Sequence, residues 1–383
     1  HIILNSLTDD SLALNVRTLS LKEASGLNLQ SLSFKINANR KELILKSFDA
    51  TLPHSHLAID NITATYQFNR KKIEPASLSF NGSIGESYIT PSDFTSLYLP
   101  LKKVKRKVVL ASDFLFFFSS IRIKSFQLSV PQTGEKPLLH SPADIRLITN
   151  GSANGLPTSI RWAATVSQLM VNGEGLKLLA GRIPDAVGRM GSLRFKGTIG
   201  GYQSDIALKG ALLSEAGNAR LGIGKHGDNL TGRMETTGFN LRQILNDKKF
   251  GTVATNINID GNIKRKLIKT KGTITRFDYN GYSYRNVTLD GQWLNGLFDG
   301  IFNINDKNIV AKVKGTLNTQ VNKTSAKLTA DIEHFAPAML NLFKGKFANN
   351  TYSANIVADF TGRSLNTANG KLSVNRLSVH TPS

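Results

Sequence analysis

Residues 351–362 read Thr-Tyr-Ser-Ala-Asn-Ile-Val-Ala-Asp-Phe-Thr-Gly, and this stretch decides the fold. Every second residue from Tyr352 to Phe360 is apolar, and most of the residues between them are polar. Successive side chains of a strand point to opposite faces, so such a strand has one dry face and one wet face. The same alternation recurs in short runs from about Leu29 to Val379. It predicts a long sheet with one apolar face rather than a compact enzyme.

The composition agrees with this prediction. The chain has 383 residues, 40% of them hydrophobic, with 32 Gly and 11 Pro. That apolar content is slightly low for a large globular protein and suits a sheet with one wet face. Asn-Gly and Asp-Gly pairs are typical of tight hairpin turns. We therefore expect turns at the pairs that begin at Asn81, Asn150, Asn280, Asn295 and Asp299.

Four short helices are expected to interrupt the strands, at residues 92–99, 175–190, 240–247 and 335–342. Asn240 is a typical N-cap, and Pro184 should break the second helix. The irregular spacing of these helices indicates a degenerate repeat, in which each module mainly contacts its neighbours. We interpret residues 1–383 as one continuous elongated fragment with approximate modules 1–91, 92–174, 175–238, 239–334 and 335–383. The two ends of the sequence suggest an internal piece of a longer chain.

The charge balance is strongly basic, with 48 Lys and Arg against 27 Asp and Glu, hence a net charge of +21. Most of these cations are expected on the wet strand face, where they oppose edge-to-edge aggregation. The densest run, residues 102–107, reads Lys-Lys-Val-Lys-Arg-Lys and has no assigned role. Its aromatic neighbours from Phe114 to Phe118 are expected to pack inward, so no nucleic-acid partner is predicted.

Sequence motifs for chemistry are sparse. Cysteine is absent, which excludes disulfides and Cys-based zinc sites. His54 and His56 lack a nearby third metal ligand and fit a turn better. The run from Gly222 to Gly227 spells a dinucleotide fingerprint, but a strand rather than a helix should follow it, which favours a hairpin. We therefore predict no enzyme activity, no metal and no cofactor.

Several stretches resemble the TamB family, the translocation and assembly module subunit, in its Bacteroidota branch. They are residues 26–34, 43–57, 239–253, 272–291 and 297–306. The resemblance implies an AsmA-like relative of bridge-like lipid transfer proteins, whose sheet folds lengthwise into a half-pipe, or β-taco, with an apolar groove. It also implies a periplasmic location and an inner-membrane anchor outside this fragment. A barrel-assembly-type protein of the outer membrane is the implied partner.

The predicted fold class is thus mostly β, an elongated repetitive sheet folded into a half-pipe with an apolar groove and a few short helices. The predicted function is a non-enzymatic conduit for phospholipids or other acyl lipids between the two envelope membranes. The residues expected to line the groove share the apolar parity of their strands: Leu32, Phe34, Ile36, Ile62, Ala64, Tyr66, Phe68, Ile206, Leu208, Ile257, Ile259, Ile309, Val313, Leu328, Ile332, Tyr352, Ile356 and Phe360.

Two other interpretations compete with the lipid conduit. One is a chaperone or scaffold that supports assembly or translocation of outer-membrane β-barrel proteins or autotransporters by strand addition. The other is a secreted β-helix adhesin or polysaccharide enzyme. That reading needs a filled core, a regular rung length and an exposed carboxylate cluster, none of which the sequence displays.

Overall fold

The computed structural model describes residues 1–8, 10–23, 28–69, 72–95, 106–155, 159–181, 183, 185–318, 324–342, 344–362 and 369–381. The chain is mostly β, with antiparallel strands and a few short helices, which confirms the predicted fold class. The chain divides into two units, each with most of its contacts within itself. Unit 1 comprises His1–Ile183 and Ser192–Gln203, and unit 2 comprises Pro184–Gly191 and Ser204–Ser383. The division into five modules stays a prediction.

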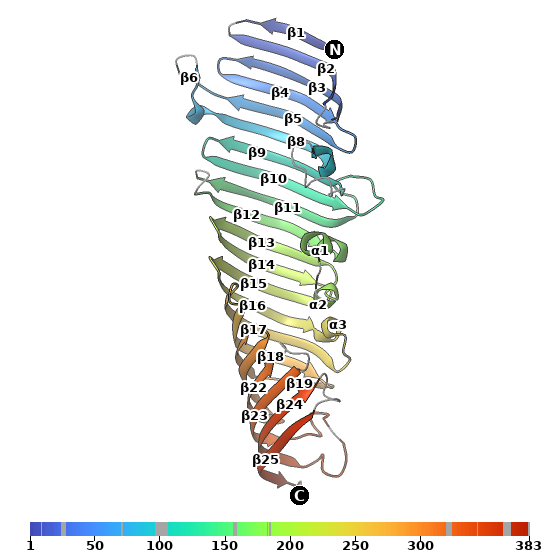
Figure 1. Ribbon diagram of the computed structural model, residues 1–383, viewed down its shortest axis with the longest axis vertical. Coiled ribbons are helices and arrows are strands. Elements are labelled where there is room, and N and C mark those ends of the chain that lie inside the picture. Colours follow the sequence, from blue (N-terminus) through green and yellow to red (C-terminus); the bar gives the residue numbers. More distant parts are fainter. Residues whose placement is uncertain are drawn as a thin grey trace. The chain divides into compact units, whose positions relative to one another are not determined.

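Unit 1 is an antiparallel sheet in which successive strands lie side by side in chain order (Figure 1). Its strands are β1 (Ile2–Leu7), β2 (Ser11–Lys22), β3 (Asn28–Asn39), β4 (Glu42–Thr51), β5 (His56–Thr65), β8 (Ser79–Ile89), β9 (Val108–Phe117), β10 (Ser120–Pro131), β11 (Ala143–Asn154), β12 (Arg161–Val171) and β13 (Leu193–Tyr202). β6 (Phe68–Asn69) and β7 (Lys72–Ile73) form a separate small hairpin. The helical elements of unit 1 are η1 (Pro75–Ser77), η2 (Pro91–Phe94) and α1 (Gly173–Ala180).

Unit 2 continues the same strand-after-strand plan, with one short strand, β19, beside β18. Its strands are β14 (Asp205–Ser214), β15 (Gly217–His226), β16 (Asn229–Asn240), β17 (Phe250–Asn262), β18 (Leu267–Tyr279), β19 (Tyr282–Tyr284), β20 (Val287–Leu294), β21 (Leu297–Asp306), β22 (Ile309–Asn318), β23 (Thr324–Phe335), β24 (Thr351–Gly362) and β25 (Asn369–His380). It also holds the helices α2 (Asp185–Gly188) and α3 (Leu241–Leu245).

The strand register turns the sequence alternation into rows of apolar side chains that cross the sheet. Residues directly opposite each other on paired strands lie on the same face. One such row in unit 2 runs through Leu221, Met234, Ile257, Gly272, Leu289, Phe302, Val313, Ala330 and Ile356. The row next to it, on the opposite face, is mostly polar and includes Arg233, Asn258, Lys271, Asp290 and Lys314.

Unit 1 follows the same rule. One of its apolar rows runs through Leu4, Leu14, Ile36, Leu45, Ile62, Gly82, Phe114, Ile123, Gly151, Ala164 and Ile199. Each unit therefore has one apolar face that extends across all of its main strands.

The apolar faces are only partly buried. The fully buried apolar residues are mostly Ala and Val, whereas larger side chains such as Ile257, Phe302 and Ile356 stay half-buried. A compact buried cluster does form in unit 1, where Val130, Ile145 and Val171 pack with neighbours that include Leu176 of α1. Over most of the described strands, however, the large side chains of the apolar face retain contact with solvent.

Two of the five predicted turns are confirmed. Asn280-Gly281 and Asn295-Gly296 have positive φ at both residues and connect adjacent strands, as the tightest hairpin turns require. The prediction is wrong for Asn81-Gly82, Asn150-Gly151 and Asp299-Gly300, which lie inside β8, β11 and β21. These glycines leave room on the apolar face: a Cβ on Gly300 would lie 2.6 Å from the ring of Phe298.

The helix predictions have mixed outcomes. α1 and α2 flank the expected break near Pro184, and Asn240 caps α3 by accepting a hydrogen bond from the Gln243 N–H at 3.3 Å. Near residue 92 the structure has only the 3₁₀ turn η2, and residues 96–99 lie outside the described part of the chain. The helix expected at 335–342 is wrong. β23 ends at Phe335, and the following residues form turns around the fully buried Leu340 and Pro337.

Candidate functional site

An apolar concavity of about 450 Å³ opens on the apolar face of unit 2. Its residues come from five consecutive strands, β18 to β22, and none of them is charged: Ile274, Phe277, Tyr279, Tyr284, Val287, Phe302, Ile304 and Val313. Its size is within the range of ligand pockets, which are mostly lined by apolar and aromatic groups. The concavity is therefore chemically suited to hydrocarbon.

Aromatic rings form one wall of the concavity. The ring centroids of Phe277 and Tyr279 are 6.3 Å apart, Tyr279 packs edge-on against Phe250 at 5.1 Å, and Tyr284 is 6.1 Å from Phe277. Burial raises the pKa of the Tyr284 hydroxyl, so this hydroxyl stays neutral at physiological pH. Rigid rings keep the wall in place at a small loss of conformational entropy.

A line of aromatic rings also leads from the concavity along β21 and β20. Phe302 is 6.2 Å from Phe298, which is 6.4 Å from Trp293, measured between ring centroids. The ring of Phe298 lies over Gly291 and Gly300, where added Cβ atoms would come within 3.0 Å and 2.6 Å of it. The two glycines thus let an aromatic ring lie flat on the sheet at this point.

A buried polar network supports the β19 side of the concavity. Asp306, only 5% exposed, accepts hydrogen bonds from the Tyr282 hydroxyl and from the Arg285 and Asn308 backbone N–H groups, the last two at 3.0 Å. The Asn308 side-chain amide donates to the Tyr282 hydroxyl oxygen at 3.1 Å. Burial, together with the hydrogen bond to Asp306, raises the pKa of Tyr282 to about 12. This network fixes the β18–β19 hairpin that carries the aromatic wall.

The predicted groove residues are mostly found on the apolar faces. In unit 2 the register places Ile206, Leu208, Ile257, Ile259, Ile309, Val313, Leu328, Ile332, Tyr352, Ile356 and Phe360 on one face. In unit 1 it places Leu32, Phe34, Ile36, Ile62 and Ala64 on the equivalent face. Tyr66 and Phe68 do not belong to the sheet. β5 ends at Thr65, and Phe68 lies in the β6–β7 hairpin, because Gln67 hydrogen-bonds to Ser77 instead of to a neighbouring strand.

Only Val313 of the predicted residues lines the concavity itself. The register of β17 and β18 shifts between the pairs Ala254–Arg276 and Thr255–Ile274. The extra residue, Thr275, reverses the parity, so that Phe277 and Tyr279 share a face with Ile274. The ring-rich run from Phe277 to Tyr284, interrupted by an Asn-Gly turn, was the available sequence signal for this site.

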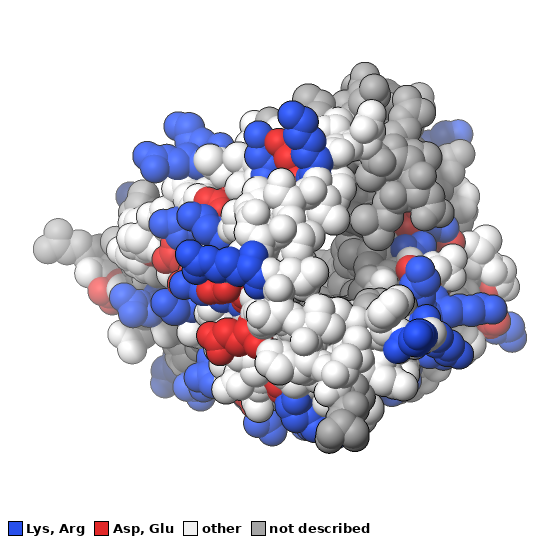
Figure 2. All heavy atoms as spheres, turned by 90° about the horizontal axis from the view of Figure 1, so that it is seen from below, with Lys and Arg blue, Asp and Glu red and all other residues white. Residues whose placement is uncertain are grey.

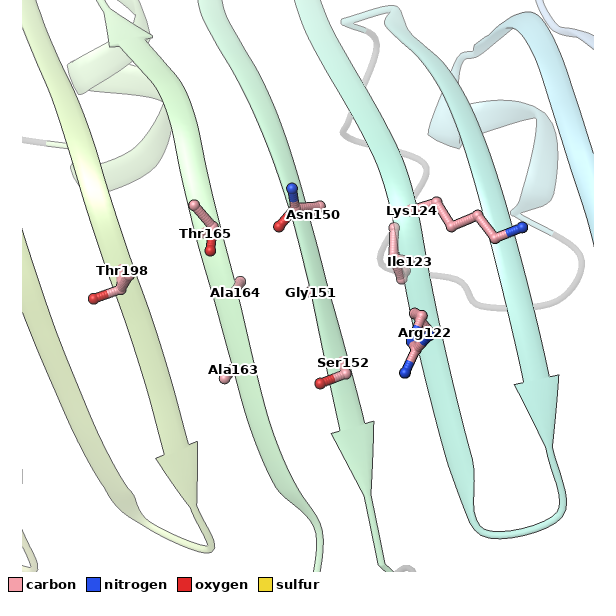
Figure 3. A pocket seen from close by; sticks show the side chains of 10 residues that line it. All are labelled: Arg122, Ile123, Lys124, Asn150, Gly151, Ser152, Ala163, Ala164, Thr165 and Thr198. Atoms are coloured by element: carbon pink, nitrogen blue, oxygen red, sulfur yellow. The ribbon is translucent and has the colours of Figure 1, made fainter.

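A second depression, of about 560 Å³, lies in unit 1, and most of its lining residues belong to rows of the polar face. Figure 3 shows its residues spread along four neighbouring strands: Arg122, Ile123, Lys124, Asn150, Gly151, Ser152, Ala163, Ala164, Thr165 and Thr198. The side chain of Lys124 points toward β9 rather than into the depression (Figure 3). Small side chains produce this shallow hollow, and its polar groups do not converge on one point.

Charged side chains occupy the polar faces and turns. Cross-strand ion pairs join Lys271 to Asp290 at 3.0 Å and Lys327 to Asp359 at 3.2 Å. In the view of Figure 2, Lys and Arg side chains project from the surface with Asp and Glu interspersed among them. Such pairs stabilise a protein little but keep the wet face soluble and set the strand register.

The basic run at 102–107 is only partly described. Residues 102–105 lie outside the described residues. Arg106 forms an ion pair with the buried carboxylate of Asp144 and donates to the Pro131 carbonyl oxygen at 2.9 Å. The Lys107 ammonium lies 5.0 Å from the centroid of the Tyr88 ring. These two cations therefore have partners within unit 1.

The remaining motifs have structural roles. His54 contacts Asp93 at 2.8 Å and His56 contacts Asp49 at 2.7 Å, so the two histidines do not converge on one point. Among the described residues no cluster suits a metal ion. Gly222 and Gly224 belong to β15, Gly227 turns with φ of 55°, and β16 follows, which confirms the predicted hairpin. None of the helices in the described part of the chain combines the length and apolarity needed to cross a membrane.

Comparisons of this chain with protein-family models, with curated proteins and with solved structures found no match. The resemblance to the TamB family therefore stays a prediction.

Proposed function

We propose that this chain is a non-enzymatic conduit that shields the acyl chains of phospholipids on its apolar face. The observation that carries the proposal is the apolar face itself. Rows of apolar side chains cross successive strands of this face, and in unit 2 the row through Phe302 and Val313 also lines the uncharged concavity. Large side chains on this face stay half-buried, so apolar area remains available to a ligand.

The energetics suit transport better than tight capture. Moving an acyl chain from water to an apolar surface is favourable by about 0.8 kcal/mol per CH₂ group. Contacts with Ile, Leu, Val and Phe have no direction along the row, so one methylene can replace another as a chain slides. A row of equivalent apolar contacts therefore holds a lipid tail while allowing it to move.

The cellular setting of the proposal follows from the sequence resemblance. We place the conduit in the periplasm, between the inner and outer membranes. A membrane anchor elsewhere in the full-length chain and a barrel-assembly-type protein of the outer membrane would complete it. The absence of cysteine is compatible with such an oxidising compartment.

Native mass spectrometry of the purified chain tests this function. We expect co-purified phospholipid adducts on the wild type and on Asn258→Asp, but their loss from Ile257→Asp. Ile257 is half-buried on the apolar face and Asn258 is exposed on the polar face, so the matched variants add one carboxylate on opposite sides of β17. A lipid-free wild type, or equal adducts on all three proteins, would contradict the proposal.

One observation favours a second candidate, a chaperone that accepts strands of outer-membrane proteins. All twelve residues of β25 are exposed, and only β24 pairs with this strand among the described residues. Exposed strand edges are templates for pairing with another chain. Crosslinks from β25 to unfolded outer-membrane proteins, in the absence of lipid adducts, would favour this candidate.

A further inference from the structure

Three neighbouring hairpin turns of unit 2 form one continuous rim. They are the β15–β16 turn (residues 226–229), the β17–β18 turn (262–267) and the β20–β21 turn (294–297). The Ile263 N–H donates to the Asp228 carbonyl oxygen at 2.9 Å, and the Asn295 N–H donates to that of Lys266 at 3.1 Å. We call these three turns, with the adjoining Ile268 and Trp293, the basic rim.

The basic rim exposes apolar side chains that a water-facing turn does not need. Ile263, Ile268, Trp293, Leu294 and Leu297 have exposed fractions between 37% and 53%. Clustered exposed apolar groups beside polar ones mark surfaces that contact a partner or a membrane. Trp in particular favours the membrane interface, where its ring meets the acyl region and its N–H meets water.

The rim is also positively charged. Lys264, Arg265 and Lys266 are exposed, and within the described residues none of their side chains forms an ion pair or a hydrogen bond. The same three turns contain one carboxylate, that of Asp228. Three adjacent free cations beside apolar groups match the chemistry of an anionic lipid surface.

We infer that the basic rim docks the protein on anionic phospholipid headgroups. The cations contact phosphate groups, while Trp293 and the neighbouring aliphatic side chains enter the headgroup layer. The exposed Ile and Leu side chains favour this partner over a nucleic acid, whose readers use aromatic platforms for stacking. The rim adjoins the aromatic line Trp293–Phe298–Phe302, so docking would bring a lipid source next to the apolar concavity. Docking is a separate property from lipid shielding in the concavity.

Vesicle flotation of the full chain tests the inference. The vesicles contain phosphatidylcholine alone or mixed with an equal amount of phosphatidylglycerol. We expect the wild type to float with the mixed vesicles, and binding to weaken as salt is raised. The variant Lys264→Gln/Arg265→Gln/Lys266→Gln should bind about a hundredfold more weakly, because each cation near such a surface contributes about 1 kcal/mol.

The matched control is Lys248→Gln/Lys249→Gln/Lys307→Gln, which also removes three exposed cations. These residues lie just before β17 and just after β21, at the strand ends opposite to the basic rim. Lys248 and Lys264 lie beyond opposite ends of β17, whose 13 residues span about 40 Å at the usual rise per residue. This control should bind as the wild type does. Trp293→Ser should weaken binding while retaining the salt dependence.

Equal binding to both vesicle types, or equal losses in the rim variant and its control, would overturn the inference. The experiment is independent of the lipid-shielding proposal. A rim variant that fails to float but keeps its co-purified lipid would show that shielding does not require docking. A lipid-free chain that still floats would show that docking does not require lipid in the concavity.

Discussion

Phe302→Asp should lower the loading of the chain with a fluorescent phospholipid more than about tenfold. The side chain of Phe302 lines the concavity and connects it to the aromatic line through Phe298. A carboxylate at this position removes apolar contact area and must be desolvated when an acyl chain covers it. Fluorescence titration of the delipidated protein measures the change in affinity.

The matched control is Asn303→Asp. Asn303 is the next residue of β21, exposed on the polar face, where its side-chain amide donates to the Thr288 hydroxyl oxygen at 3.1 Å. The Asn303→Asp substitution adds the same charge as Phe302→Asp to the same strand, but on the opposite face. The affinity for lipid should therefore be unchanged. Similar affinities for the Phe302→Asp and Asn303→Asp variants would argue against binding on the apolar face.

Asp306→Ala should lower the free energy of unfolding of unit 2 by about 3 kcal/mol, because the donors that Asp306 satisfies lose their buried acceptor. These donors are the Tyr282 hydroxyl and the backbone N–H groups of Arg285 and Asn308. The chain has two Trp residues, so a Trp162→Phe background leaves Trp293 to report on unit 2 alone. Urea unfolding followed by its fluorescence gives the difference.

Asp290→Ala is the control for this experiment. It removes the exposed ion pair with Lys271, so the free energy of unfolding should change by less than about 1 kcal/mol. If both substitutions had the same small effect, the buried network would not be what holds the β18–β19 hairpin.

The strand faces could be predicted from the sequence because period-two alternation leaves little choice of register. A shift of one residue in β24 would expose Ile356 and bury Asp359, which fixes which side chains face the apolar side. That logic holds for Ile257, Leu328 and most of the expected groove residues. It fails at Tyr66 and Phe68, where the chain leaves the sheet after Thr65 although the alternation continues.

The sequence pattern did not predict the concavity, and the reason is physical. A single extra residue at Thr275 reverses the parity of β18, and a bulge of this kind leaves no clear mark in the hydrophobic pattern. Glycines inside strands led to wrong turn predictions for a similar reason. Asp299-Gly300 has the composition of a hairpin turn, yet Gly300 lies within β21 beneath the ring of Phe298. Only the three-dimensional pairing separates a glycine that turns the chain from one that makes room for a ring.

Photo-crosslinking from single cysteines tests most directly whether lipid occupies one face of the sheet. The chain has no native cysteine, so a photoactivatable label can be attached to one chosen position at a time. We predict lipid crosslinks from Ile257, Leu289 and Val313 on the apolar row, and none from their polar-face neighbours Asn258, Asp290 and Lys314. Crosslinks of equal yield from both sets, or from neither, would contradict the account.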